Sequence, residues 1–75
     1  MEEKILEILE AISGTDEVRN DRDLNLFEAG LLDSLGVIEL LVGIEEQLGI
    51  KIEPTEVDRK EIDTTNKILS YIAKR

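Results

Sequence analysis

The chain has 75 residues and a mass of 8.5 kDa, which allows one small domain with a modest core. Its formal net charge of −9 excludes nucleic acid and anionic membranes as main partners, because their phosphates would be repelled. The absence of cysteine and histidine excludes disulfides, thiolate nucleophiles, histidine-dependent catalytic triads and the usual zinc sites. We therefore do not expect an independent enzyme.

The start of the chain, Met1-Glu2-Glu3-Lys4, lacks the basic segment and the unbroken apolar run of a secretory signal. The longest apolar run is Leu40-Leu41-Val42, whereas a membrane span needs about 20 such residues. These features predict a cytoplasmic protein.

The first predicted element is a helix over residues 3 to 13. Its apolar residues recur at i, i+3, i+4 and i+7, which is the spacing of one helix face. They are Ile5, Ile8, Leu9 and Ile12. Gly14 follows at the position where a left-handed residue commonly ends a helix.

Residues 14 to 33 show no sustained period and are expected to form a long loop. Residues that favour turns occur there together with several apolar ones. The apolar residues are Leu24, Leu26, Phe27, Leu31 and Leu32. Because the loop carries so many apolar side chains, we expect it to pack against the core. Loops of this length are uncommon in small domains and often functional.

A second helix is predicted from Asp33 or Ser34 to Leu48, because Asp33 can cap its first turn and Gly49 can end it. Residues 50 to 53 should be extended as far as Pro54.

Residues 55 to 62 are then expected to hold one short helical turn. Thr64 or Thr65 can cap a last helix that runs to about Lys74. Its inward residues should be Ile68, Leu69 and Ile72. The prediction is a single all-α domain over residues 1–75, a bundle of three main helices and one short helix.

The second predicted helix carries more apolar residues than one core face requires. At about 100° per residue, one stripe should face the core. That stripe is Val37, Leu41, Ile44 and Leu48. Further apolar and acidic residues lie on or near the opposite side. They are Leu35, Ile38, Glu39, Val42 and Glu46. Exposed apolar residues beside charge often mark interfaces, so this side is either a partner-binding face or part of an unusually buried helix.

Two groups of acidic residues could be interpreted as chemical sites. Asp21-x-Asp23-x-Asn25 resembles the start of a calcium-binding loop, but Leu26 and Leu32 stand where such loops need glycine and a bidentate glutamate. The pairs Glu45/Glu46 and Glu61/Asp63 are expected to be solvated, since acid–base catalysis needs a carboxyl group in a cleft. We predict no metal site and no catalytic residue.

The pair Asp33-Ser34 is most simply a helix cap. A serine in the first turn of a helix also presents its hydroxyl outward. Without a histidine to activate it, this hydroxyl is a poor catalyst but a good acceptor for a group that another enzyme attaches. A phosphate ester there would lie at a helix N-terminus, where backbone N–H groups favour negative charge.

The segment from Phe27 to Gly36 resembles the phosphopantetheine attachment site of acyl and peptidyl carrier proteins. Its core is Gly, two hydrophobic residues, Asp, Ser and another hydrophobic residue, and the resemblance extends over essentially the whole chain. It implies a small four-helix carrier-protein bundle that is not itself a catalyst. It also implies that Ser34, flanked by the capping Asp33, carries a 4′-phosphopantetheine arm from coenzyme A. The thiol of the arm would hold cargo as a thioester.

Within this family, five features look like the D-alanyl carrier proteins of teichoic acid D-alanylation. They are Phe27-Glu28-x-Gly30-Leu31-Leu32-Asp33-Ser34, Gly36, Glu39-Leu40-Leu41, Glu56-x-Asp58-Arg59 and Thr65-Asn66-Lys67-Ile68. Carriers of the fatty-acid type usually have an acidic residue at position 36. The implied partners are a phosphopantetheinyl transferase, an adenylating ligase and a downstream acyltransferase, which can be membrane-bound.

Two alternatives stay open. A carrier of the same type could serve fatty-acid or other specialised acyl synthesis, and it would also need Ser34. An unmodified helical adaptor could bind partner proteins through the second helix, and it would not need Ser34. In each case we expect a monomer that binds no nucleic acid.

Overall fold

The computed structural model describes all residues from Met1 to Arg75 and contains helices and turns but no strand. Its α-helices are α1 (Glu2–Ser13), α2 (Glu17–Asn20), α3 (Ser34–Leu48) and α4 (Thr65–Ala73). Two 3₁₀ turns, η1 (Pro54–Glu56) and η2 (Arg59–Glu61), lie between α3 and α4. The predicted all-α class and the three long helices are confirmed.

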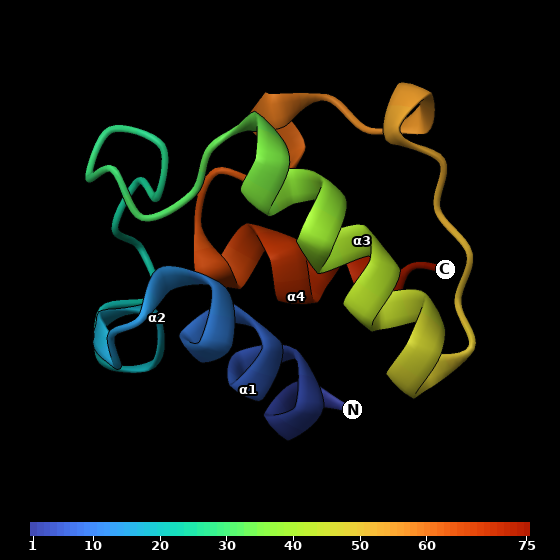
Figure 1. Cartoon of the computed structure of the whole chain (residues 1–75), viewed down its shortest axis with the longest axis horizontal. Helices are drawn as coiled ribbons and strands as arrows, with labels where there is room; N and C mark the ends of the chain where they lie inside the picture. Colours follow the sequence, from blue (N-terminus) through green and yellow to red (C-terminus); the bar gives the residue numbers. More distant parts are fainter.

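The three longer helices surround one core (Figure 1). Helix α1 packs along α3, and α4, in red, is seen between them in this view. Thirteen buried residues form the core, and every one of them is Leu, Ile or Val. Both aromatic residues, Phe27 and Tyr71, are half-buried and pack against its edge, so the buried core itself consists of aliphatic side chains.

The helix ends follow the predicted signals. Gly14 and Gly49 end α1 and α3 with φ of 74° and 69°, a left-handed conformation that glycine adopts without steric cost. The Gly36 N–H donates a hydrogen bond of 2.7 Å to the Asp33 carboxylate, which caps α3. At α4 the cap is Thr64, whose side chain accepts a hydrogen bond from the backbone, whereas Thr65 is buried inside the helix.

The connection between α1 and α3, predicted to be a loop, contains the short helix α2. One turn, α2, buries Val18 and places Arg19 beside α1. The Arg19 guanidinium donates hydrogen bonds of 2.8 Å to the carboxylates of Glu3 and Glu10. A helix of four residues is too short to show a period, and these ion pairs with α1 stabilise it from outside.

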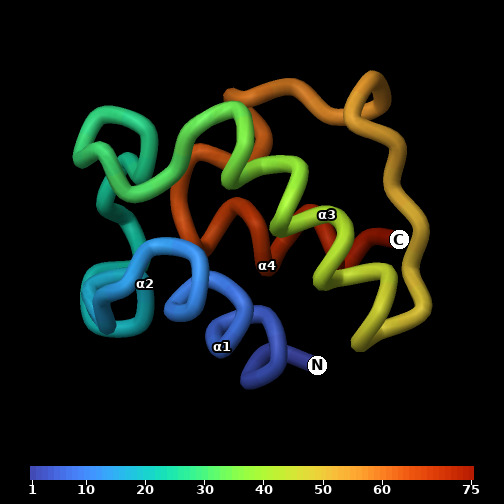
Figure 2. The backbone as a smooth tube through the Cα atoms, viewed as in Figure 1, coloured from blue at the N-terminus to red at the C-terminus, as the bar shows by residue number.

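The remainder of this connection packs against the core, as predicted. Leu26 and Leu32 are buried, and the Leu26 N–H donates a hydrogen bond of 2.7 Å to the Asp63 carbonyl oxygen. The Asn66 N–H donates another, of 3.0 Å, to the Arg22 carbonyl oxygen. Figure 2 shows the resulting path, in which the connection arches past the end of α1 and meets the start of α3.

The predicted short helix over residues 55 to 62 is instead the pair of turns η1 and η2. Pro54 does not merely end the extended segment, because it is the first residue of η1, where its fixed φ suits a helical turn. A capping box closes each turn: Glu53 with Glu56 at η1, and Asp58 with Glu61 at η2.

Candidate functional site

Ser34 is exposed at the first position of α3. The preceding residue, Asp33, is extended, with φ of −134° and ψ of −173°, and its carboxylate turns back to accept the Gly36 N–H. One oxygen of the acidic side chain, Oδ1, is therefore engaged in the cap. This arrangement holds the helix start rigid and leaves the Ser34 hydroxyl at the surface.

The glycine two residues after the serine, Gly36, lies in a closely packed position. It is buried, and a Cβ atom there would lie 3.0 Å from Leu32 Cδ1 and 3.3 Å from Asp33 Oδ1. It would also lie 3.4 Å from a methyl group of Ile12 on α1. A longer side chain at this position would displace Leu32 or disturb the cap. The glycine thus lets the first turn of α3 lie close to α1.

Arg59 contacts Ser34, although the sequence gives no sign of this contact. Its Nη2 donates a hydrogen bond of 2.6 Å to Ser34 Oγ, and its Cζ lies 4.7 Å from the centre of the Phe27 ring. Phe27 comes from the long connection, Ser34 from α3 and Arg59 from η2. The only sequence signal was the stretch Glu56-x-Asp58-Arg59, which does not show that its arginine reaches back 25 residues to the serine.

Two hollows border the start of α3. One, of about 190 Å³, lies between α3 and the turns η1 and η2. Its lining is mainly apolar apart from Ser34 and Arg59, and the other residues are Val37, Ile38, Pro54, Val57 and Ile62. The second, of about 210 Å³, lies toward the end of α1 and includes Asp33, Leu35 and Glu39. The serine therefore has a small apolar groove directly beside it.

The outer side of α3 is exposed rather than buried. Leu35, Ile38 and Val42 keep 66%, 43% and 49% of their surface, and Glu39 and Glu46 are also exposed. These are the five residues predicted for a partner-binding face, and they form one strip of apolar and acidic side chains. The structure thus rules out the alternative of an unusually buried helix.

The core side of α3 is broader than the predicted stripe. Leu41 and Ile44 are buried, as expected, but Val37 and Leu48 are only half-buried. Leu40, which the stripe omitted, is fully buried. The reason is that α3 packs against both α1 and η1, so two neighbours widen the arc of the helix that is covered.

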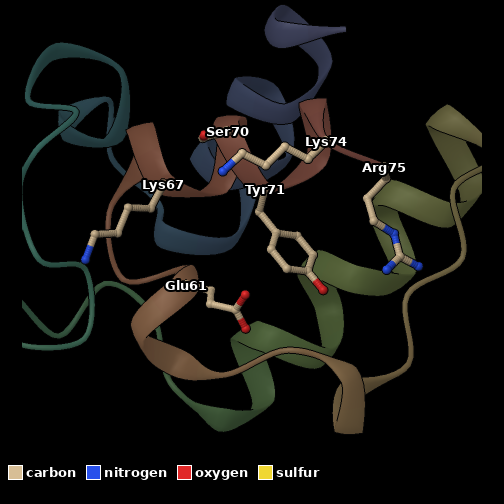
Figure 3. Close-up of a pocket in the computed structure, with 6 residues that line it drawn as sticks. All are labelled: Glu61, Lys67, Ser70, Tyr71, Lys74 and Arg75. Atoms are coloured by element: carbon tan, nitrogen blue, oxygen red, sulfur yellow. The ribbon is translucent and has the colours of Figure 1, made fainter.

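The largest hollow, of about 310 Å³, does not include Ser34 (Figure 3). Three of its six lining residues come from α4, namely Lys67, Ser70 and Tyr71, and Lys74 follows directly after that helix. The Arg75 guanidinium at its edge is paired with Glu56 at 3.3 Å, and Lys67 is paired with Asp63 at 3.1 Å. The hollow is open, and two of its three cationic side chains are already paired with carboxylates. Its lining residues form no grouping that supports chemistry.

In the segment Asp21-x-Asp23-x-Asn25, which resembles the start of a calcium-binding loop, side-chain oxygen atoms accept hydrogen bonds from the protein itself. Asp23 Oδ1 accepts a hydrogen bond of 2.8 Å from Asn66 Nδ2. Asn25 Oδ1 accepts the N–H groups of Phe27 and Glu28. These contacts close the turn and link it to α4.

No group of three Cys, His, Asp or Glu side chains is arranged to hold a metal ion. None of the helices has the length and apolar character needed to span a membrane.

Comparisons with known proteins agree with this geometry. Residues 3–72 match the family model described as the phosphopantetheine attachment site. The chain is 48% identical over 75 residues to the D-alanyl carrier protein of Abiotrophia defectiva, which covers 100% of this chain and 95% of that protein. It is 49% identical over 72 residues to that of Enterococcus faecalis, covering 96% and 92% of the two chains. It is 47% identical over 68 residues to the D-alanyl carrier protein of Lacticaseibacillus rhamnosus, and the match covers 91% of this chain and 84% of that protein. The chain therefore belongs to the phosphopantetheine attachment-site family and is a non-catalytic phosphopantetheine carrier protein, homologous to D-alanyl carrier proteins.

Proposed function

We propose that Ser34 is the attachment point of the 4′-phosphopantetheine arm and that the arm carries D-alanine as a thioester. The observation that supports the attachment most strongly is the exposed Ser34 hydroxyl at the first residue of α3, where Asp33 caps the helix. Ser34 also lies within the matched region, residues 3–72.

The attachment is a phosphoryl transfer in which this chain supplies the acceptor oxygen. Ser34 Oγ forms a bond to the phosphorus that bears the pantetheine group in coenzyme A. The bond from that phosphorus to its neighbouring phosphate breaks, and adenosine 3′,5′-bisphosphate leaves. The hydroxyl proton passes to a base on the transferase, since this chain has no histidine and Asp33 Oδ1 already accepts the Gly36 N–H. The new negative charge lies at the start of α3, where the helix dipole stabilises it.

The relatives and the groove beside Ser34 support a small cargo. The relatives at 47–49% identity are D-alanyl carrier proteins over nearly their whole length. The groove holds about 190 Å³, below the roughly 300–1,000 Å³ of ordinary ligand pockets. In the loading step, the arm's thiol attacks the carbonyl carbon of an aminoacyl adenylate. A thioester forms, AMP leaves, and the thiol proton is released. The alternative cargo, a fatty or other specialised acyl group, uses the same thiol.

The partners we propose are a phosphopantetheinyl transferase, an adenylating ligase and a downstream acyltransferase. They would bind the exposed strip of α3, namely Leu35, Ile38, Glu39, Val42 and Glu46. A carrier must leave each enzyme quickly, so the contact should be small, below about 1,200 Å² in total. We also propose that residues 1–75 act as a single monomeric carrier domain in the cytoplasm and bind no nucleic acid.

The attachment is tested by incubating the chain with coenzyme A and a phosphopantetheinyl transferase of broad specificity. The wild-type chain should gain one phosphopantetheine group, and Ser34→Ala should gain none while keeping its helical circular dichroism spectrum. Ser13→Ala and Ser70→Ala serve as matched controls and should be modified normally. Full modification of Ser34→Ala would contradict the proposal, and normal partner binding by a chain that is never modified would favour the adaptor.

The cargo is tested on the modified chain with a D-alanine-activating ligase, ATP and either D-alanine or L-alanine. D-alanine should be loaded and released by hydroxylamine, which cleaves thioesters. A parallel reaction with a ligase that activates fatty acids provides the comparison. Efficient loading with the fatty acid and none with D-alanine would overturn the D-alanine assignment but leave the Ser34 assignment intact.

A further inference from the structure

Arg59 is the only arginine of this chain without a carboxylate partner. The chain contains four arginines, and three of them form ion pairs: Arg19 with Glu3 and Glu10, Arg22 with Glu2, and Arg75 with Glu56. The Arg59 guanidinium has no carboxylate oxygen within 4.0 Å, and its hydrogen bond to a side chain goes to the neutral Ser34 hydroxyl. In a chain with a net charge of −9, an uncompensated cation beside the serine is available to an anion.

The contacts around Arg59 hold it in place. The Asp58 N–H donates a hydrogen bond of 2.9 Å to Glu61 Oε1, so the capping box fixes the backbone of η2. The guanidinium carbon lies 4.7 Å from the centre of the Phe27 ring, a distance at which cation–π attraction operates. The Phe27 N–H in turn donates to Asn25 Oδ1. The backbone of Arg59 is thus fixed by η2, and the Phe27 ring covers one face of its guanidinium. This order lowers the conformational entropy that the side chain loses when it binds an anion.

We propose, on the basis of the Ser34 assignment, that Arg59 is a positioning residue for the arm. Before modification, its Nη2 donates to one lone pair of Ser34 Oγ at 2.6 Å. A hydroxyl group has one proton to donate and two lone pairs that accept. With one lone pair held by Arg59, the hydroxyl proton is directed away from the guanidinium and toward a base on the transferase.

After modification, Arg59 pairs with the phosphodiester. The esterified oxygen is then a weak acceptor, and the charge resides on the two non-bridging oxygens of the attached phosphorus. Those oxygens lie one bond beyond the phosphorus that Ser34 Oγ binds, so a guanidinium already 2.6 Å from Oγ reaches them with a small side-chain movement. Its planar fork of donors matches a phosphate. The groove that Arg59 and Ser34 both line would receive the first part of the arm.

The test compares Arg59→Ala and Arg59→Lys with Lys60→Ala. Lys60 is the neighbouring exposed cation, and the structure uses only its backbone carbonyl, so its truncation removes the same charge without a contact. Each chain is modified fully with coenzyme A, and the phosphorus NMR signal of the isolated holo carrier is recorded. The side-chain N–H signal of Arg59 is recorded before and after modification of the wild type. The kcat/KM of the transferase provides a second readout.

We expect the phosphorus signal to shift in Arg59→Ala, less in Arg59→Lys and not in Lys60→Ala, and the Arg59 signal to move on modification. We expect kcat/KM to fall about three- to tenfold in Arg59→Ala and to stay within about twofold in Lys60→Ala. An unchanged phosphorus signal in Arg59→Ala, together with an unmoved Arg59 signal, would overturn the inference. If Ser34 itself is never modified, it is the proposed function that fails, which the wild-type reaction reveals before any Arg59 variant is compared.

Discussion

At the start of α3, a few atoms determine where the proposed acceptor hydroxyl lies. The Asp33 carboxylate binds the Gly36 N–H at 2.7 Å, and Gly36 has no side chain that would press on Leu32. Ser34 therefore projects from a first turn of α3 that the Asp33–Gly36 hydrogen bond stabilises. Asp33 and Gly36 act first as folding signals for the helix start, and the same contacts leave the Ser34 hydroxyl pointing outward.

Removing the cap should destabilise the domain without abolishing its fold. Asp33→Ala leaves the Gly36 N–H without its side-chain partner, so the free energy of unfolding should fall by about 1 kcal/mol. Asp33→Asn keeps an oxygen that can accept this bond and is the matched control. Urea denaturation followed by circular dichroism measures both variants. Equal stability of Asp33→Ala and the wild type would show that the cap contributes nothing.

At the scale of elements, α3 divides into a core side and an exposed side. Leu41 and Ile44 are buried, whereas Leu35 and Val42 project into solvent. The same helix therefore holds the bundle together and offers an apolar strip beside acidic residues. Substitutions on the two sides should differ in kind, because one side contributes to stability and the other to the proposed partner contacts.

Truncation on the core side should lower the free energy of unfolding by roughly 2–5 kcal/mol in Leu41→Ala and Ile44→Ala, since each leaves a cavity. Leu35→Ala and Val42→Ala should change it by less than about 0.5 kcal/mol but should impair arm transfer or cargo loading. Thermal unfolding and transferase or ligase kinetics are measured on all four variants. Normal kinetics in both exposed variants would remove this strip from the proposed interface.

The contact between α1 and α2 predicts a dependence on pH. Hydrogen bonds from the Arg19 guanidinium hold the pKa of Glu3 and of Glu10 below the ordinary value of 4.5. A carboxyl group whose pKa is lowered by folding stabilises the folded state above its unfolded pKa, and this stability is lost as the pH falls through the folded pKa. Stability should therefore decline as the pH falls below about 5, and Arg19→Met should reduce this dependence.

Lys4→Met is the control for Arg19→Met, because it removes an exposed cation of α1 that makes no ion pair. Denaturant midpoints are measured from neutral pH down to acid. The wild type and Lys4→Met should lose stability in parallel, and Arg19→Met should show the flatter curve. If all three curves have the same slope, the ion pairs of Arg19 do not couple folding to protons.

For the whole molecule, the long helices could be predicted because each spans several turns and carries its own end signals. Gly14, Asp33 and Gly49 are local signals that do not depend on the tertiary structure. The short elements could not be predicted, because α2 depends on the ion pairs of Arg19 with α1, and η1 and η2 depend on capping boxes within single turns. A one-turn element has no period to detect.

The same distinction holds for the site. Asp33 and Ser34 are recognisable because their residue types and spacing are local features of the chain. Arg59 reaches Ser34 only because residues 50 to 64 return along α3, so its position depends on the folded structure. The groove between η1, η2 and α3 likewise could not be predicted from the sequence, because segments distant along the chain form it.

The charge of the whole molecule should affect how partners approach. With a net charge of −9 and acidic residues on the exposed strip of α3, the chain should be attracted to basic surfaces on its enzymes. The kcat/KM of transferase and ligase should therefore fall as salt rises from about 50 to 500 mM, because salt screens this attraction. Kinetics independent of salt would show that apolar contacts alone govern the encounter.

The central claim, that this carrier holds its arm on Ser34, is tested most directly by locating the arm in the wild-type chain. The chain is treated with coenzyme A and a phosphopantetheinyl transferase, cleaved into peptides, and fragmented in a mass spectrometer. We predict one phosphopantetheine group per chain, located on Ser34. A group located on Ser13 or Ser70, or a chain that stays unmodified beside a control carrier that is modified in the same tube, would contradict the claim.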